Sequence, residues 1–338
     1  MKNMISENDI IKICKEYNIQ VSEINNFIDS SKGEDDIRYN YVINNKFVLK
    51  MNTNGVITEK TLMEIDALQN RYRSIGVYCP RIYKTRECNY LYLYSKDSTD
   101  YQCYIEEYAP YKTARDVIDT YEGKLKMLGH LGRLAALYTN VDLVETHSMW
   151  SIIDLAPLDE NIDEKQGNLN SLVESLNNRS FNVLADRLVT INEEMREIIK
   201  SNFASLPRCV YQGDLNPSNV LVDDKGDFIG IIDFNLFGTE VNINCFLNEC
   251  MYYLEEKDFE TLSALEIYNK MNDMQAKLLN KILEYYELND VENKCFNAYK
   301  MIIDISFYPN VEIMKYCLEE NKEVEKVIEL ITLMIDDK

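Results

Sequence analysis

Apolar and polar positions alternate along the amino-terminal part of the chain, and this pattern predicts a small antiparallel β-sheet. Short apolar runs bounded by polar turns predict strands at 24–28, 37–43, 47–51, 80–83, 90–94 and 101–108. Two helices are predicted in the same part, at 6–17 and 58–73, because their apolar residues recur at helical spacing. The pair Asn44-Asn45 has the composition of a tight turn between two of these strands.

From residue 111 onward, helical spacing replaces alternation. We expect one helix to begin near Ala114, and further helices at 124–138, 181–203, 246–254, 262–286, 292–305 and 311–335. The acidic stretch 154–165 is predicted to be an irregular connection. No repeat or flexible linker interrupts this order, so we expect two lobes joined at a hinge: an amino lobe of residues 1–107 and a helical carboxy lobe of residues 108–338.

Candidate chemistry is concentrated in residues 210–234. A hairpin is predicted at 220–232, with Asn219 just before its first strand and Asp233 just past its second. The hairpin therefore places Asn219 close to Asp233, and an amide oxygen beside a carboxylate suits a hard cation such as Mg²⁺. Asp214 precedes Asn219 with the D-x-x-x-x-N spacing of a kinase catalytic loop, in which the Asp receives the proton of the acceptor hydroxyl.

This stretch resembles the aminoglycoside phosphotransferase family, small-molecule kinases with a protein-kinase-like fold that include relatives of choline and homoserine kinases. The residues similar to its motifs are Gln212-Gly213-Asp214, Asn219-Val220-Leu221 and Ile232-Asp233-Phe234. The resemblance implies an α+β fold of two lobes, a small antiparallel sheet followed by a mostly helical lobe. It also implies that Asp214 is the catalytic residue and that Asn219 and Asp233 are metal ligands.

The chain departs from the family pattern at two positions. Gln212 stands where the family usually has His, a residue that mostly braces the loop. Asn244 stands where many members have the Asp of a D-L-A element.

Lys50 ends the apolar run of the third predicted strand, where a kinase places the lysine that contacts the α- and β-phosphates. A solvated lysine at a strand end is the commoner arrangement, so this assignment depends on the catalytic motif that follows it. Glu64, in the predicted helix 58–73, is the candidate partner that would orient Lys50. Glu59 is the alternative partner, and an ordinary surface charge pair is the alternative role for Glu64.

Two further segments are candidates for nucleotide binding. Ser31 and Gly33 lie in a polar turn that could supply hydroxyl and amide groups to the phosphates, with a plain hairpin turn as the alternative. The last strand of the amino lobe ends in Glu-Tyr, which resembles the hinge of the family. That resemblance implies that the carbonyl of Glu107 and the amide of Ala109 hold the base, and a strand-to-helix turn is the alternative.

The formal charge of −21 over 338 residues argues against nucleic acid and anionic membrane surfaces as partners. It is compatible with a cationic substrate, although acidity that merely keeps the protein soluble explains it equally well. Nine scattered cysteines without a C-x-x-C motif predict reduced thiols in a cytoplasm rather than a disulfide framework or a zinc site. We expect no signal peptide and no membrane span, because charged residues interrupt every apolar run.

Together these features predict an ATP- or GTP-dependent phosphotransferase that moves a γ-phosphate to a hydroxyl of a small molecule, with Mg²⁺ as cofactor. The acceptor suggested by the resemblance is an aminoglycoside or another amino-bearing compound, and a metabolic kinase for homoserine, choline or a sugar is the alternative. A kinase-fold nucleotide-binding protein with little activity is the third interpretation, because of Gln212 and Asn244. No A-P-E motif follows Asp233, so protein-kinase activity is not expected. The choice of nucleotide and the oligomeric state are left open.

Overall fold

The computed structural model describes residues 5–33, 35–116, 121–155 and 161–336. Contacts divide the chain into two compact units, each built from two separate segments. The first unit comprises residues 1–118 and 217–232, and the second comprises residues 119–216 and 233–338. The functional lobes predicted at 1–107 and 108–338 stay a prediction.

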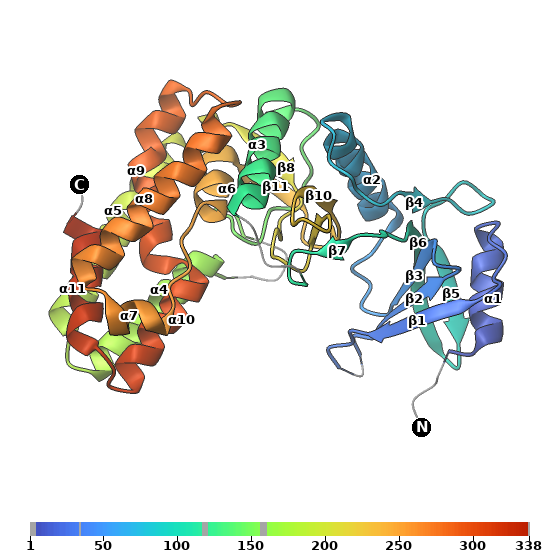
Figure 1. Cartoon of the computed structure of the whole chain (residues 1–338), viewed down its shortest axis with the longest axis horizontal. Coiled ribbons are helices and arrows are strands. Elements are labelled where there is room, and N and C mark those ends of the chain that lie inside the picture. Colours follow the sequence, from blue (N-terminus) through green and yellow to red (C-terminus); the bar gives the residue numbers. More distant parts are fainter. Residues whose placement is uncertain (1–4, 34, 117–120, 156–160, 337–338) are drawn as a thin grey trace. The chain divides into compact units, whose positions relative to one another are not determined.

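A six-stranded antiparallel sheet forms the centre of the first unit (Figure 1). Its strands lie in the order β1-β2-β3-β6-β4, and β5 pairs with β6. The strands are β1 (Ile24–Asp29), β2 (Arg38–Ile43), β3 (Phe47–Asn52), β4 (Ile82–Tyr83), β5 (Tyr92–Lys96) and β6 (Thr99–Glu107). Asn44 and Asn45, between β2 and β3, have φ values of 54° and 51°, which confirms the predicted tight turn.

Helix α1 (Glu7–Glu16) packs against this sheet (Figure 1). Its apolar stripe, which includes Ile10 and Ile13, shares a buried core with strand residues such as Leu49 and Ile105. Ser6 begins the helix with a capping box, because its side chain accepts a hydrogen bond from the amide of Asp9. The second helix of this unit, α2 (Glu59–Ser74), begins at its N-cap Thr58 and buries one apolar face.

The predicted hairpin is confirmed within the first unit, where β9 (Val220–Val222) pairs with β10 (Phe228–Ile231). A third strand, β7 (Lys112–Thr113), adds to β9. The helix expected to begin near Ala114 is wrong in its start, because residues 114–116 form a turn in which the amide of Ala114 donates to the carbonyl of Val220. Residues 117–120 lie outside the described part of the chain.

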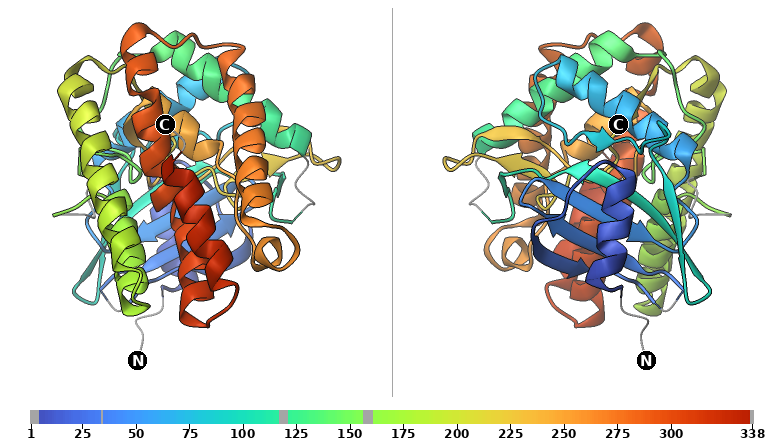
Figure 2. Two further views of the ribbon diagram at one scale, coloured as in Figure 1. Left: turned by 90° about the vertical axis from the view of Figure 1, so that its left-hand side faces the viewer. Right: turned by 90° about the vertical axis from the view of Figure 1, so that its right-hand side faces the viewer.

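The second unit is mostly helical (Figure 2). Helix α5 packs against α9, and α8 packs against both α3 and α11. Two short strands, β8 and β11, pair beside them. The elements are α3 (Tyr121–Tyr138), α4 (Glu164–Asn178), α5 (Asn182–Asn202), β8 (Arg208–Tyr211), β11 (Gly238–Val241), α6 (Asn242–Glu249), α7 (Glu256–Thr261), α8 (Ala264–Leu283), α9 (Asp290–Ser306), α10 (Tyr308–Glu319) and α11 (Val324–Asp336).

The helices of this unit differ from the predicted ones in four places, one of which is the short helix α7, where no helix was predicted. Helix α4 was not predicted, because glycine, asparagine and serine weaken its helical pattern. The single helix predicted at 311–335 is two helices, α10 and α11, separated by a turn. The helix predicted at 246–254 begins earlier, at Asn242, and ends at Glu249. None of the helices in the described part of the chain has the length and apolar character needed to cross a bilayer.

Candidate active site

Gln212, at the end of β8, connects the two backbone segments that carry the candidate aspartates. Its side chain is fully buried. Its Oε1 accepts a hydrogen bond from the amide of Asp214 at 2.7 Å, and its Nε2 donates to the carbonyl oxygen of Asp233 at 2.5 Å. A neutral histidine also offers one donor and one acceptor, so the amide of Gln212 can make the same kind of bridge.

Gly213 lets the catalytic loop approach the segment after Asp233 closely. Its φ is +84°, and a Cβ at this position would lie 2.0 Å from the carbonyl oxygen of Leu236. Only glycine fits both conditions without displacing the backbone. The carbonyl of Gly213 also accepts a 2.7 Å hydrogen bond from Nε1 of Trp150. The loop before Asp214 therefore packs closely against the backbone of Leu236 and is hydrogen-bonded to Trp150.

Asp214 lines a cavity of about 240 Å³ that lies entirely within the second unit. Its carboxylate Oδ1 accepts a 2.8 Å hydrogen bond from the side-chain amide of Asn216. The other side chains that enclose the cavity include Trp150, Lys165, Asn248, Glu249, Tyr253 and Phe307. A fixed carboxylate that faces a small cavity is the arrangement required of a base that receives a proton from a bound hydroxyl.

Asp233 has a left-handed backbone conformation, with φ at +56°. This conformation is unusual for a residue other than glycine, and such outliers cluster at functional sites. In the first unit, the amide of Ile232 donates to the carbonyl of Asn219 at 2.9 Å, so the hairpin pairing extends to the residue that precedes Asp233. The amide of Asn219 and the carboxylate of Asp233 are oxygen donors of the kind that Mg²⁺ prefers.

Lys50 of β3 forms an ion pair with Glu106 of β6, with 3.2 Å between Nζ and Oε2. Both side chains are largely buried. Glu106 was not identified from the sequence, although an acidic residue within the apolar run of the last strand indicates such a role. The carboxylate of Glu64 pairs with Lys60 at 3.9 Å, and its predicted pairing with Lys50 stays a prediction. Glu59 accepts hydrogen bonds from the backbone amides of residues 90 and 91.

The other predicted nucleotide contacts lie in the first unit. The hydroxyl of Ser31 donates to the carboxylate of Asp29 and accepts from the amide of Arg38, so this side chain is engaged within its own turn. The position of Gly33 has open space around it. At the end of β6, the amide of Glu107 donates to the carbonyl of Arg81, whereas the amide of Ala109 has no acceptor among the described residues.

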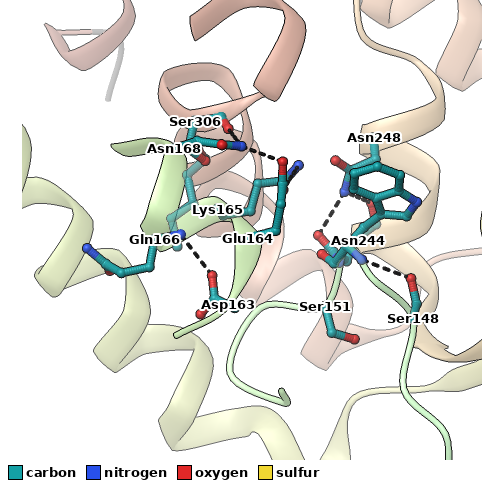
Figure 3. A network of polar contacts seen from close by, with 12 residues as sticks. Ser148, Ser151, Asp163, Glu164, Lys165, Gln166, Asn168, Asn244, Asn248 and Ser306 are labelled. Carbon is teal, nitrogen blue, oxygen red and sulfur yellow. Dashed lines mark hydrogen bonds and ion pairs between the residues drawn. The ribbon is translucent and has the colours of Figure 1, made fainter. Parts of the chain in front are cut away.

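Asn244 has a structural role in the network shown in Figure 3. Its side-chain amide donates to the carbonyl of Trp150 at 2.8 Å, and its oxygen accepts from Asn248 at 3.1 Å. Nearby, burial raises the pKa of Glu240 to about 7, although hydrogen bonds from Asn244 and Ser151 oppose this shift. The amide at position 244 therefore lies beside a buried carboxyl group that accepts hydrogen bonds.

Glu249 is a second carboxyl group with a perturbed pKa, and it lines the same cavity as Asp214. Burial raises the pKa of Glu249 to about 7, the negative charge of Asp214 adds to the shift, and the ammonium of Lys124 opposes it. Perturbed carboxyl groups in a cavity are typical of functional sites. Glu249 was not identified from the sequence, because no motif surrounds it.

Comparisons with known proteins bear on the family and the fold. The sequence model described as the phosphotransferase enzyme family (APH) matches residues 33–240. No curated protein sequence matches the chain. Among solved structures, the chain is similar to amicoumacin kinase hAmiN in complex with AMP-PNP, Ca²⁺ and Ami, with 15% identity, a TM-score of 0.53, and 99% of this chain and 94% of that chain covered.

Two further structures show weaker similarity. A microcompartment-associated aminopropanol kinase has 12% identity and a TM-score of 0.49, with 96% of this chain and 95% of that chain covered. The spectinomycin phosphotransferase APH(9)-Ia, in complex with ADP and spectinomycin, has 12% identity and a TM-score of 0.47, with 98% of each chain covered. The predicted α+β class, a small antiparallel sheet followed by a helical carboxy-terminal part, is confirmed.

Proposed function

Because the chain belongs to the phosphotransferase enzyme family, whose sequence model matches more than half of it, we propose that it is a nucleotide-dependent kinase. In this proposal the γ-phosphate of ATP or GTP moves to a hydroxyl of a small amino-bearing molecule. The observation that carries the proposal is the fixed position of Asp214, whose backbone is bridged to that of Asp233 by Gln212 and whose side chain lines a cavity.

Asp214 receives the proton of the acceptor hydroxyl as the oxygen attacks the γ-phosphorus. The hydrogen bond from Asn216 orients its carboxylate, and the cavity supplies the space for the acceptor. Little covalent chemistry is required of the protein in such a transfer, so positioning and charge stabilisation account for most of the rate enhancement. Asp214 is therefore the residue whose removal should affect transfer more than nucleotide binding.

Asn219 and Asp233 would hold Mg²⁺, which neutralises phosphate charge when it is bound. Lys50 would contact the α- and β-phosphates, and its ion pair with Glu106 supports the proposal by fixing the ammonium. Glu64 would add a second carboxylate to this arrangement. For the base we propose the carbonyl of Glu107 and the amide of Ala109, an amide that has no acceptor within the described residues.

The phosphate loop in this proposal is the turn that contains Ser31 and Gly33. The open space around Gly33 supports it, because phosphate oxygens need close access to backbone amides. We also propose that the reaction takes place in a cytoplasm. All nine cysteines carry free thiols, which supports a reducing compartment.

A nucleotide-consumption screen tests the proposed function. The protein is supplied with Mg²⁺ and either ATP or GTP, together with aminoglycosides, amino alcohols, hydroxylated amino acids and sugars, and phosphorylated products are identified by mass. We expect one acceptor class to be phosphorylated. Asp214→Asn should abolish that transfer while nucleotide affinity is retained. Nucleotide binding without phosphorylation of any acceptor would contradict the proposal, as would normal turnover by Asp214→Asn.

A further inference from the structure

The cavity at Asp214 contains a buried lysine, Lys165. The residue lies in the first turn of α4 and is only 1% exposed. Asp163 caps this helix and forms an ion pair with Arg196, with 2.6 Å between Oδ2 and Nη1. The amide of Asn168 donates to the carbonyl of Ser306, which ties α4 to the end of α9. These contacts hold Lys165 in place, so the ammonium is a fixed part of the cavity wall.

The ammonium of Lys165 has donor capacity left over. It lies 5.4 Å from the ring centres of both Trp150 and Phe307. Within the described residues its single hydrogen-bond partner is the carboxylate of Glu164, at 3.0 Å. An ammonium carries three N–H donors, and a buried donor without an acceptor is costly. A group with acceptor oxygens in the cavity would satisfy the remaining donors.

An unsatisfied acceptor lines the same cavity. Asn248 is 9% exposed, and its Oδ1 has no hydrogen-bond partner within the described residues. Its Nδ2 is already used, because it donates to Asn244. The carboxyl group of Glu249 follows it on α6 and also lines the cavity. Figure 3 shows Asn248 of α6 on the side that faces Glu164 and Lys165 of α4. The cavity therefore presents acceptors on α6 and a donor on α4.

We infer that the acceptor is a small hydroxylated α-amino acid. Its ammonium binds Oδ1 of Asn248 and the carboxyl group of Glu249, its carboxylate binds the ammonium of Lys165, and its hydroxyl faces Asp214. An α-amino acid carries a donor group and an acceptor group on one carbon, which matches a donor and acceptors that face one cavity. This inference rests on the proposed function for the fate of the hydroxyl, but the binding of the amino acid head group does not depend on it.

The size of the cavity and the ammonium in its wall favour this class over a polycationic acceptor. A volume of about 240 Å³ is below the roughly 300–1,000 Å³ of pockets for drug-sized ligands. The ammonium of Lys165 also offers a partner for a ligand carboxylate, a group that a polycation lacks.

Two matched sets of probes test the inference. The first set keeps the hydroxyl: homoserine, 3-aminopropanol, which lacks the carboxylate, and 4-hydroxybutyrate, which lacks the amine. Transfer from ATP or GTP to each is measured, with an aminoglycoside in parallel. The second set lacks the hydroxyl: 2-aminobutyrate, propylamine and butyrate. Their binding is measured by ligand-observed NMR, which needs no phosphoryl transfer. Each measurement is made on the wild-type protein, on Lys165→Met and on the control Lys270→Met, whose lysine pairs with Asp258 and does not line the cavity.

We expect 2-aminobutyrate to bind the wild-type protein at least 10-fold more tightly than either single-charge analogue. Lys165→Met should weaken the binding of 2-aminobutyrate by about 10- to 100-fold, the range for one hydrogen-bonded charge pair, and should not weaken the binding of propylamine. Lys270→Met should behave like the wild type. Equal binding of all three analogues, or an unchanged preference in Lys165→Met, would overturn the inference, as would efficient transfer to the aminoglycoside alone. If 2-aminobutyrate binds as expected and no hydroxyl compound is phosphorylated, the inference on the head group stands and the proposed kinase activity fails.

Discussion

The hydrogen bonds of Gln212 predict a measurable cost when this side chain is replaced. Gln212→Leu removes two bonds and leaves the amide of Asp214 and the carbonyl of Asp233 without their partner in a buried site. An unsatisfied buried group costs about 1–3 kcal/mol, so for two such groups we expect the free energy of unfolding to fall by about 2–6 kcal/mol. A small displacement of a catalytic group can reduce the rate by about 100-fold, and we expect kcat/KM to fall by at least that factor.

Two further variants of Gln212 separate the bridge from the volume of the side chain. Gln212→His retains one donor and one acceptor, so it should keep most of the stability and activity. Gln212→Glu retains the acceptor for the amide of Asp214 but presents a carboxylate oxygen to the carbonyl of Asp233, so it should lose at least as much as Gln212→Leu. Urea unfolding and steady-state kinetics on the identified acceptor measure both effects. Equal unfolding midpoints and equal kcat/KM for wild type and Gln212→Leu would refute the bridging role.

Three other predictions concern separate parts of the molecule. Burial raises the pKa of Glu240 to about 7, so its carboxyl group stays protonated in the folded state at pH values where the unfolded chain has lost that proton. The free energy of unfolding should therefore fall as the pH rises from about 4.5 to about 7, by on the order of 3 kcal/mol. Glu240→Gln should remove that part of the decline in pH-dependent urea titrations, with Glu249 retaining its own share, and an undiminished decline would contradict the assignment. A Cβ on Gly132 would lie 2.4 Å from the carbonyl oxygen of Ile282, so Gly132→Ala should cost about 1–3 kcal/mol in urea unfolding. Gly129→Ala, which meets only the side-chain ends of Tyr285 and Lys281, is its control and should cost less. Glu106→Gln should weaken the hold on Lys50 and raise KM for the nucleotide several-fold in the transfer assay, with kcat less affected; an unchanged KM would mean that the pair has no part in nucleotide binding.

Local sequence patterns predicted the turns and strands that depend on only a few adjacent residues. The tight turn at Asn44 and Asn45 and the hairpin before Asp233 were both predicted because turn chemistry is encoded in a few adjacent residues. Helix α4 was missed because its stability comes from burying leucines such as Leu169 and Leu172 against neighbouring helices, which its low propensity conceals. The strand β7 was missed for a similar reason, since its two residues are ordered by pairing with β9.

The sequence offers candidates for the site where residues share one motif, and it offers none for the cavity residues outside that motif. Asp214, Asn219 and Asp233 belong to one short stretch, so their spacing alone indicated their chemistry. Lys165 and Asn248 are far apart in the sequence, and nothing in either local pattern indicates that they line the same cavity. Such residues are brought together by the packing of helices, and the contacts between helices cannot be predicted from local patterns in a single sequence.

The division of each compact unit into two segments has a consequence for how the protein is made. Synthesis proceeds from the amino terminus, and domains fold as they are completed. The first unit contains residues 217–232, so a nascent chain that ends at residue 118 carries β7 without its partner β9. That unpaired strand edge is a template for association with other chains. Residues 119–216 must therefore emerge before the three-stranded sheet of β7, β9 and β10 is complete, and no cut at a single point separates one unit from the other.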